Sequence, residues 1–155
     1  MPVDEIAPGI DSGTLLPGAQ FADAYRIAVN DTALDARRAA ERMIGRQPRW
    51  GRALLVLRNI LVRPFGLKTS GAGGTADMIG IFPVVCETSQ RLVAGFDDRH
   101  LDFRIVVDVA TVGSRQNVTA TTLVRTHNRL GRTYLAIILP FHRLIVRAMM
   151  RQVAA

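Results

Sequence analysis

The chain has almost no cysteine, because Cys86 is the only one among its 155 residues. An internal disulfide is therefore excluded, and the framework of a small disulfide-rich secreted domain is absent. The first residues also lack the basic start and the apolar run of a signal peptide. We therefore expect a cytoplasmic protein.

Long apolar runs are missing as well. A helix that spans a bilayer needs about 20 mostly apolar residues in sequence. The longest apolar run here, residues 134–141, is much shorter and contains Pro140. We therefore expect that the chain is not an integral membrane protein.

Acidic residues are absent after Asp108, and the chain carries a formal net charge of +7. The same stretch contains the arginines Arg115, Arg125, Arg129, Arg132, Arg143, Arg147 and Arg151. Aromatic residues make up only 6% of the chain and do not alternate with basic ones, so we expect no nucleic-acid partner. The charge pattern favours a solvated basic surface. The alternative is a peripheral interaction module in which Arg143, Arg147 and Arg151 contact an anionic surface.

The motifs of several enzyme classes are also missing. The chain has neither a Gly-x-Ser-x-Gly elbow nor a phosphate-binding loop. Gly71 and Gly73 match a dinucleotide fingerprint only superficially, because a helix end is predicted before them and a strand after them. His100, His127 and His142 lie far apart and lack metal-ligand spacing. We therefore expect neither a metal nor a cofactor.

The residues that are present have the ordinary composition of a globular protein, with 48% hydrophobic and 21% charged residues. The length fits one domain with a genuine core. Residues 1–19 contain several prolines and glycines and few large apolar side chains, so we expect an irregular N-terminal arm. Residues 20–155 form the predicted single domain.

Local signals in the first half predict one strand and two helices. Residues 21–29 alternate in the manner of a strand. A start similar to a capping box predicts a helix over residues 32–44, which a glycine ends. A second helix is predicted over residues 48–64, with a proline at either end. Residues 68–77 form a predicted glycine-rich loop.

From residue 78 the apolar period changes from that of a helix to that of a strand. Alternating residues predict four further strands, at residues 82–88, 91–96, 101–111 and 118–127. Short polar turns join them, which is typical of an antiparallel meander. The order of one strand, two helices, several strands and a final helix predicts the α+β class.

The most informative stretch is the amphipathic pattern of residues 132–153. One helical face holds Tyr134, Ile137, Ile138, Phe141, Leu144, Ile145, Ala148, Met149 and Val153. The opposite face holds Thr133, Ala136, Pro140, Arg143, Arg147 and Arg151. Because so apolar a face needs cover, we expect a long helix that packs on the sheet and is kinked at Pro140.

Three stretches carry a resemblance to a known family. The first is LVAGFDDRHLDFR at 92–104, and the third is PFHRLIV at 140–146. The second spans residues 121–134 and contains TT at 121–122, HN at 127–128 and GRTY at 131–134. They resemble an uncharacterised bacterial family of the START-like (SRPBCC) superfamily. That superfamily includes polyketide cyclases and the birch-pollen allergen. The resemblance covers residues 20–153 and assigns no catalytic residue.

The resemblance implies a helix-grip fold, in which a curved antiparallel sheet with two short helices grips a long, kinked C-terminal helix. The superfamily usually has six or seven strands, whereas the pattern of this chain shows five. We expect the missing strand near Ile79 or in the N-terminal arm. The family sometimes follows a nucleotide-binding reductase domain, so the resemblance also implies a reductase partner.

A sheet gripped by an apolar helix often encloses a cavity. The leading hypothesis is therefore a protein that binds a hydrophobic or amphipathic small molecule there. The predicted lining residues are Trp50, Phe82, Phe103, Ile105, Val107, Tyr134, Ile138 and Phe141. The alternative is that the same side chains fill a solid core.

The polar cluster Asp97-Asp98-Arg99-His100 supports a second hypothesis, an enzyme of the cyclase or dehydratase kind. Asp98, His100 or His127 would act as acid–base groups, because burial and neighbouring charges can move their pKa values toward neutrality. The alternative is a hairpin turn whose aspartates bind the adjacent backbone.

The strand at residues 101–111 directs Asp102, Arg104 and Asp108 away from its apolar face. Arg125 shares one face of the following strand with His127. We expect cross-strand Arg–Asp pairs on a solvated sheet face. The alternative is that Arg104 or Arg125 clamps a ligand carboxylate.

Overall fold

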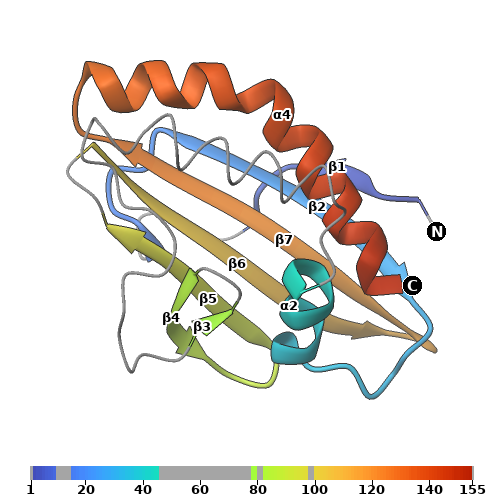
Figure 1. The fold of residues 1–155 in the computed structure, drawn as a ribbon. Helices are drawn as coiled ribbons and strands as arrows, with labels where there is room; N and C mark the ends of the chain where they lie inside the picture. Colours follow the sequence, from blue (N-terminus) through green and yellow to red (C-terminus); the bar gives the residue numbers. More distant parts are fainter. Residues whose placement is uncertain (1, 10–14, 46–77, 80–81, 98–99, 155) are drawn as a thin grey trace.

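The computed structural model describes residues 2–9, 15–45, 78–79, 82–97 and 100–154. Seven strands within these ranges form one sheet in the order β1-β2-β7-β6-β5-β4-β3, and all neighbours are antiparallel. The strands are β1 (Asp4–Ile6), β2 (Phe21–Val29), β3 (Met78–Ile79), β4 (Phe82–Glu87), β5 (Arg91–Asp97), β6 (Leu101–Val112) and β7 (Arg115–Thr126). The helices α2 (Ala36–Gly45) and α4 (Arg129–Ala154) lie over one face of the sheet (Figure 1). The predicted α+β class is confirmed.

The five strands predicted from the period of two are present as β2, β4, β5, β6 and β7. The two segments in which we expected the missing strand both form one, β1 in the N-terminal arm and β3 beside β4. β7 begins earlier than predicted, at Arg115, which pairs with Val112. Gly113, whose φ is 61°, allows the chain to reverse within two residues.

Each described helix begins after a capping side chain. Asp35 Oδ1 accepts a hydrogen bond of 2.8 Å from the Arg38 N–H, so α2 begins later than predicted. Asn128 Oδ1 accepts one of 2.9 Å from the Gly131 N–H, so α4 begins earlier than predicted. The helix predicted over residues 48–64 and the glycine-rich loop after it lie outside the described residues.

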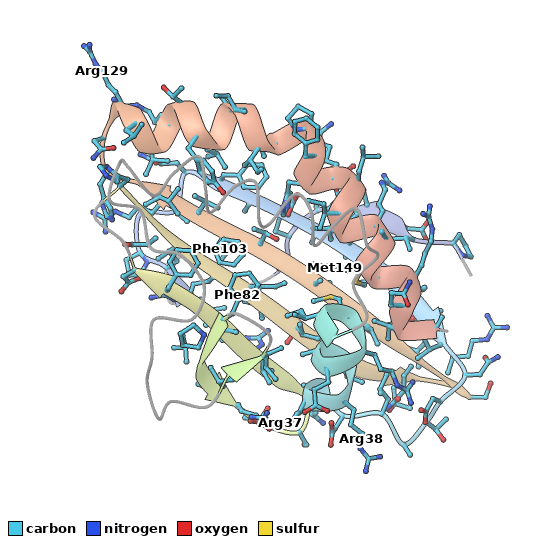
Figure 2. All side chains as sticks on the ribbon, viewed as in Figure 1. Arg37, Arg38, Phe82, Phe103, Arg129 and Met149 are labelled. Carbon is cyan, nitrogen blue, oxygen red and sulfur yellow. The ribbon has the colours of Figure 1, made fainter. Side chains whose placement is uncertain are left out.

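The main core lies between the sheet and both helices. Alternate strand residues face it, among them Tyr25, Ile27, Leu92, Val107 and Val118, each at most 1% exposed. The helices contribute Ala39, Ala40 and Met43 from α2, and Val146, Met149, Met150 and Val153 from α4. Figure 2 shows Met149 between α4 and the sheet. Burial of one large apolar side chain stabilises a fold by roughly 1.5–3 kcal/mol.

The two faces of the sheet carry different kinds of residues. We call the face under α2 and α4 the helix face, and the opposite one the outer face. Strand alternation places Val93, Val106 and Leu123 on the outer face, where they are also buried. Polar residues such as Asp102 and Asp108 share the outer face with them.

Only part of the predicted apolar face of α4 packs on the sheet. Ile137, Phe141 and Leu144 are 64%, 45% and 61% exposed, so the prediction that these three face the sheet is wrong. The reason is that apolar residues occupy more than one side of this helix, and a single rotation of the helix cannot bury them all. α4 also bends in its middle (Figure 1), and Pro140 lies within it and removes one backbone hydrogen bond.

Candidate functional site

The candidate site begins with two polar side chains on the helix face of β2. Asp23 and Tyr25 share this face with Ile27 and Val29, because strand residues two apart point the same way. Asp23 is 8% exposed and Tyr25 is fully buried. Burial of a carboxylate is costly unless it is paired, so Asp23 needs a partner.

His142 of α4 is that partner. Its Nε2 lies 3.0 Å from Asp23 Oδ2, and its side chain is 17% exposed. The rings of His142 and Phe21 also make a T-shaped contact, with the two ring centroids 6.0 Å apart. An ionised Asp23 accepts the hydrogen bond from the imidazole N–H. This bond ties the sheet to α4 close to Pro140, and it leaves the second ring nitrogen, Nδ1, for other contacts.

Two buried atoms of the site have no hydrogen-bond partner in the part of the chain that the structure describes. They are Asp23 Oδ1 and the Tyr25 hydroxyl oxygen. Burial raises the pKa of Tyr25 above its usual value of 10.0, and Asp23 and Glu5 raise it further. The phenol therefore keeps its proton at neutral pH. The site thus contains one unused donor and one unused acceptor.

Arg147 closes the site at the β1 edge. Its guanidinium lies 5.2 Å from the centre of the Tyr25 ring and donates a hydrogen bond of 3.2 Å to the Val3 carbonyl. Its Nη2 lies 3.7 Å from the Glu5 carboxylate. Arg147 is therefore occupied within the fold, and the N-terminal strand belongs to the surroundings of the site.

A cluster of three phenylalanines lies on the same helix face, over β4, β5 and β6. Phe82 lies 5.3 Å from Phe103 and 6.3 Å from Phe96, measured between ring centroids, and all three are partly buried. Figure 2 shows Phe82 and Phe103 close together above the strands. Two of the predicted lining residues are thus in contact.

The register connects the polar and the aromatic groups across the sheet. One row runs from Phe21 through Val124 to Phe103 and Phe96, and the next runs from Asp23 through Thr122 to Ile105. A third row joins Tyr25 to Val107 through Ala120. Two strand spacings, about 10 Å, separate β2 from β6. Ile105 and Val107 of β6 therefore lie level with Asp23 and Tyr25, and Phe103 lies level with Phe21.

The other predicted lining residues have different positions. Ile105 and Val107 are at most 5% exposed and belong to the core. Tyr134 and Ile138 of α4 are partly buried, whereas Phe141 is 45% exposed. Trp50 lies outside the described residues. Phe141 does not face the sheet, and that the other residues line a ligand cavity stays a prediction.

The predicted acid–base residues lie apart from Asp23 and His142. His127 Nε2 is 3.0 Å from Oδ1 of Asp102, a residue of the outer face. His100 Nδ1 is 2.7 Å from Asn128 Nδ2, and the His100 carbonyl accepts a hydrogen bond of 2.9 Å from the His127 N–H. Asp98 lies outside the described residues. A catalytic role for these residues stays a prediction.

The arginines and aspartates of the outer face form pairs. Arg91 Nε lies 2.6 Å from Asp108 Oδ1, and this hydrogen bond raises the pKa of the Arg91 guanidinium. Arg104 Nη2 lies 2.8 Å from Asp97 Oδ1. The pairs thus join β5 to β6. Arg125 instead donates a hydrogen bond of 3.2 Å to the Pro17 carbonyl.

The described ranges contain no cluster of side chains that could hold a metal ion. None of their His, Cys, Asp and Glu side chains gather in groups of three or more around a common point. Cys86, on β4, is exposed. The Asp23–His142 pair brings together only two groups of the type that bind metals.

Asp23, Tyr25 and His142 were not predicted as a site from the sequence. A signal was present, because Asp23 is the one charged residue in the alternating stripe that ends in Ile27 and Val29. His142 likewise interrupts an apolar part of the C-terminal helix. Either pattern marks a buried polar group, but neither says that the two groups meet.

Comparison with known proteins gives a family without an assigned function. The model of a family described as "Protein of unknown function (DUF2867)" matches residues 15–149. No curated protein matches the chain significantly. A conserved protein from Geobacillus kaustophilus, known from a crystal structure, is 9% identical with a TM-score of 0.43, over 86% of this chain and 93% of that one. CalU16 from Micromonospora echinospora is 11% identical with a TM-score of 0.32, over 86% of this chain and 80% of that one.

Proposed function

Since the chain belongs to the DUF2867 family, whose function is unknown, we propose its function from the residues of the site. The proposal is a helix-grip protein that binds an amphipathic small molecule between the sheet and α4. The polar group of this molecule meets Asp23 and Tyr25, and its apolar body meets the aromatic residues of β4, β5 and β6. A cytoplasmic location and a reductase partner remain predictions.

The observation that carries the proposal is the pair of buried polar atoms without a partner, Asp23 Oδ1 and the Tyr25 hydroxyl. Each unsatisfied buried group costs about 1–3 kcal/mol. A ligand hydroxyl can donate to the carboxylate oxygen and accept from the phenol, and it thereby offsets both costs. The expected polar group is therefore a neutral hydroxyl, because an anion would be repelled by Asp23.

The register supports an apolar body beside this hydroxyl. Ile105 and Val107 lie level with Asp23 and Tyr25, and Phe103 lies one row further along β6. The surface that a ligand would meet beyond the polar pair is thus hydrophobic and partly aromatic. A flat molecule of two fused rings with one hydroxyl suits this arrangement.

Binding of 2-naphthol, followed by its fluorescence, tests the proposal. We expect saturable binding to the whole protein, and binding about fivefold to tenfold weaker for Tyr25→Phe, because one hydrogen bond is lost. Asp102→Asn is the matched control, since it changes an aspartate of the outer face whose side chain is 13% exposed. Native mass spectrometry of gently purified protein would identify any molecule that the protein retains. Equal binding by all three proteins, or none by the unaltered one, contradicts the proposal.

A second candidate function is proton transfer, and the hydrogen bond between Asp23 and His142 favours it. A carboxylate that holds an imidazole by one nitrogen fixes its tautomer and leaves the other nitrogen as an acid–base group. His142 would then remove a C–H proton from a bound ketone and return a proton to the same carbon.

Hydrogen–deuterium exchange of 2-tetralone in D₂O, followed by NMR, tests this candidate. We expect the protein to accelerate exchange beside the carbonyl, His142→Gln to abolish the acceleration, and His127→Gln to retain it. Loss of exchange in His127→Gln alone would instead favour the residues predicted from sequence, Asp98, His100 and His127. Exchange no faster than in buffer rules out this activity towards the probe.

A further inference from the structure

The outward side of α4 carries an apolar stripe that the fold does not use. Ile137, Phe141 and Leu144 follow one another at helical spacing and are 64%, 45% and 61% exposed. Among the described residues only Val85 and Val112 are large hydrophobic side chains of comparable exposure. Three neighbouring exposed apolar residues on two turns of one helix mark an interaction surface.

Arginines accompany this stripe without any acidic residue on the same helix. α4 contains Arg129, Arg132, Arg143, Arg147 and Arg151, and no Asp or Glu. Arg147 pairs with Glu5, whereas Arg132, Arg143 and Arg151 are exposed and form no ion pair within the described ranges. Arg129 points away from the molecule at the start of the helix (Figure 2). By helical spacing, the arginines lie along one flank of the apolar stripe, so the stripe has a cationic border on one side.

We propose that this side of α4 docks on an anionic lipid surface. Ile137, Phe141 and Leu144 enter the boundary between headgroups and acyl chains, and Arg132, Arg143 and Arg151 contact lipid phosphates. An amphipathic helix with a cationic flank binds membranes in this manner. The inference does not depend on the proposed ligand site, which lies on the opposite side of α4.

Two other occupants fit the surface less well. A second copy of this chain would cover the apolar stripe, but it would bring two sets of arginines together with no acidic residue on either helix. A span across the bilayer conflicts with the second half of α4, where Val146, Met149, Met150 and Val153 are buried in the core. α4 has the length and apolar composition of a spanning helix, but a single such helix is weak evidence.

Sedimentation with lipid vesicles tests the proposal on the whole protein. We expect binding to vesicles of phosphatidylcholine and phosphatidylserine at low salt, weaker binding at high salt, and little binding to phosphatidylcholine alone. The double variant Ile137→Ser and Leu144→Ser should bind at least about tenfold more weakly. Arg143→Gln with Arg151→Gln should weaken binding about tenfold and reduce its dependence on salt.

Matched controls keep the result interpretable. Val112→Ser removes an equally exposed apolar residue of β6, and Arg115→Gln removes an exposed arginine of β7, so both should bind as the unaltered protein does. Because every altered side chain is exposed, thermal unfolding should be unchanged. Absence of binding at low salt, or equal binding by the serine variant, overturns the proposal. If the unaltered protein is a dimer in solution and the serine variant is a monomer, the surface binds a second copy of the chain instead.

Discussion

At the scale of single residues, Tyr25 shows how a site differs from a core. Its ring is packed like those of its apolar neighbours and lies under the Arg147 guanidinium, yet its hydroxyl has no partner within the described part of the chain. A phenylalanine would fill the same space without this cost. A tyrosine at such a position is therefore explained better by binding than by stability.

Tyr25→Phe should accordingly stabilise the protein. We expect the free energy of unfolding to rise by about 1 kcal/mol, because a buried hydroxyl without a partner is removed. Urea denaturation of the protein without added ligand measures this change. Tyr134→Phe, at a partly exposed tyrosine, is the control and should give no gain. Destabilisation by Tyr25→Phe would mean that the hydroxyl is satisfied within the fold.

At the scale of elements, the start of α4 is fixed by a close backbone contact. A Cβ placed on Gly131 would lie 2.1 Å from the His100 carbonyl oxygen, which also accepts the His127 N–H. No side chain fits this space, so glycine is required where the helix begins. The segment before β6 and the first turn of α4 therefore hold one another in place.

Gly131→Ala should destabilise the protein by about 2 kcal/mol, because helix and backbone must separate to admit the methyl group. Thermal or urea unfolding measures the loss. Gly9→Ala provides the comparison, since nothing lies within 4 Å of a Cβ at that position. If both variants unfold like the parent protein, the contact between α4 and His100 does not contribute to stability.

The connection before α2 predicts a dependence on pH. The Ala33 N–H and then Arg42, which lies 3.0 Å away, hold the pKa of Asp31 below its usual value of 3.8. A lowered pKa means that the folded state favours the ionised form. Its stabilisation is present above pH 3.8 and is lost as the pH falls through the lower pKa of the folded state.

Asp31→Asn should therefore be less stable than the parent protein at neutral pH, and the difference should shrink below pH 3.8. Urea midpoints at several pH values measure it. Glu41→Gln, on the exposed side of α2, is a suitable comparison. A difference between Asp31→Asn and the parent that does not change with pH would show that the carboxylate charge plays no part.

At the scale of the whole molecule, the Asp23–His142 hydrogen bond joins the sheet to the bent helix. The two residues belong to β2 and α4, near opposite ends of the chain, and both are largely buried. If one partner is removed, the other stays buried without its hydrogen bond, and this costs stability. Replacement of both by apolar residues removes that cost.

His142→Leu should destabilise the protein by about 3 kcal/mol, and Asp23→Leu combined with His142→Leu should recover most of this loss. A double-mutant cycle in urea measures the coupling. The Asp102–His127 pair of the outer face has the same distance of 3.0 Å but a more exposed histidine, so its coupling should be smaller. Additive losses in the first cycle would contradict the proposed link between sheet and helix.

The sequence by itself determined which segments form strands and the final helix. The change of apolar period at residue 78 predicted β4 to β7, and the alternation of residues 21–29 predicted β2. These predictions succeeded because the period of apolar residues follows from local backbone geometry. The turn at Gly113 and the caps Asp35 and Asn128 account for differences between the predicted and the observed ends of β7, α2 and α4.

Tertiary structure decided which residues meet. Asp23 and His142 are 119 positions apart, and no local pattern specifies the register of β2 on β7 or the rotation of α4 above them. The rotation also left Ile137, Phe141 and Leu144 outside, although they share an apolar face in the sequence. Both outcomes depend on how the whole set of side chains packs, because a helix with apolar residues on several sides has more than one way to cover a sheet.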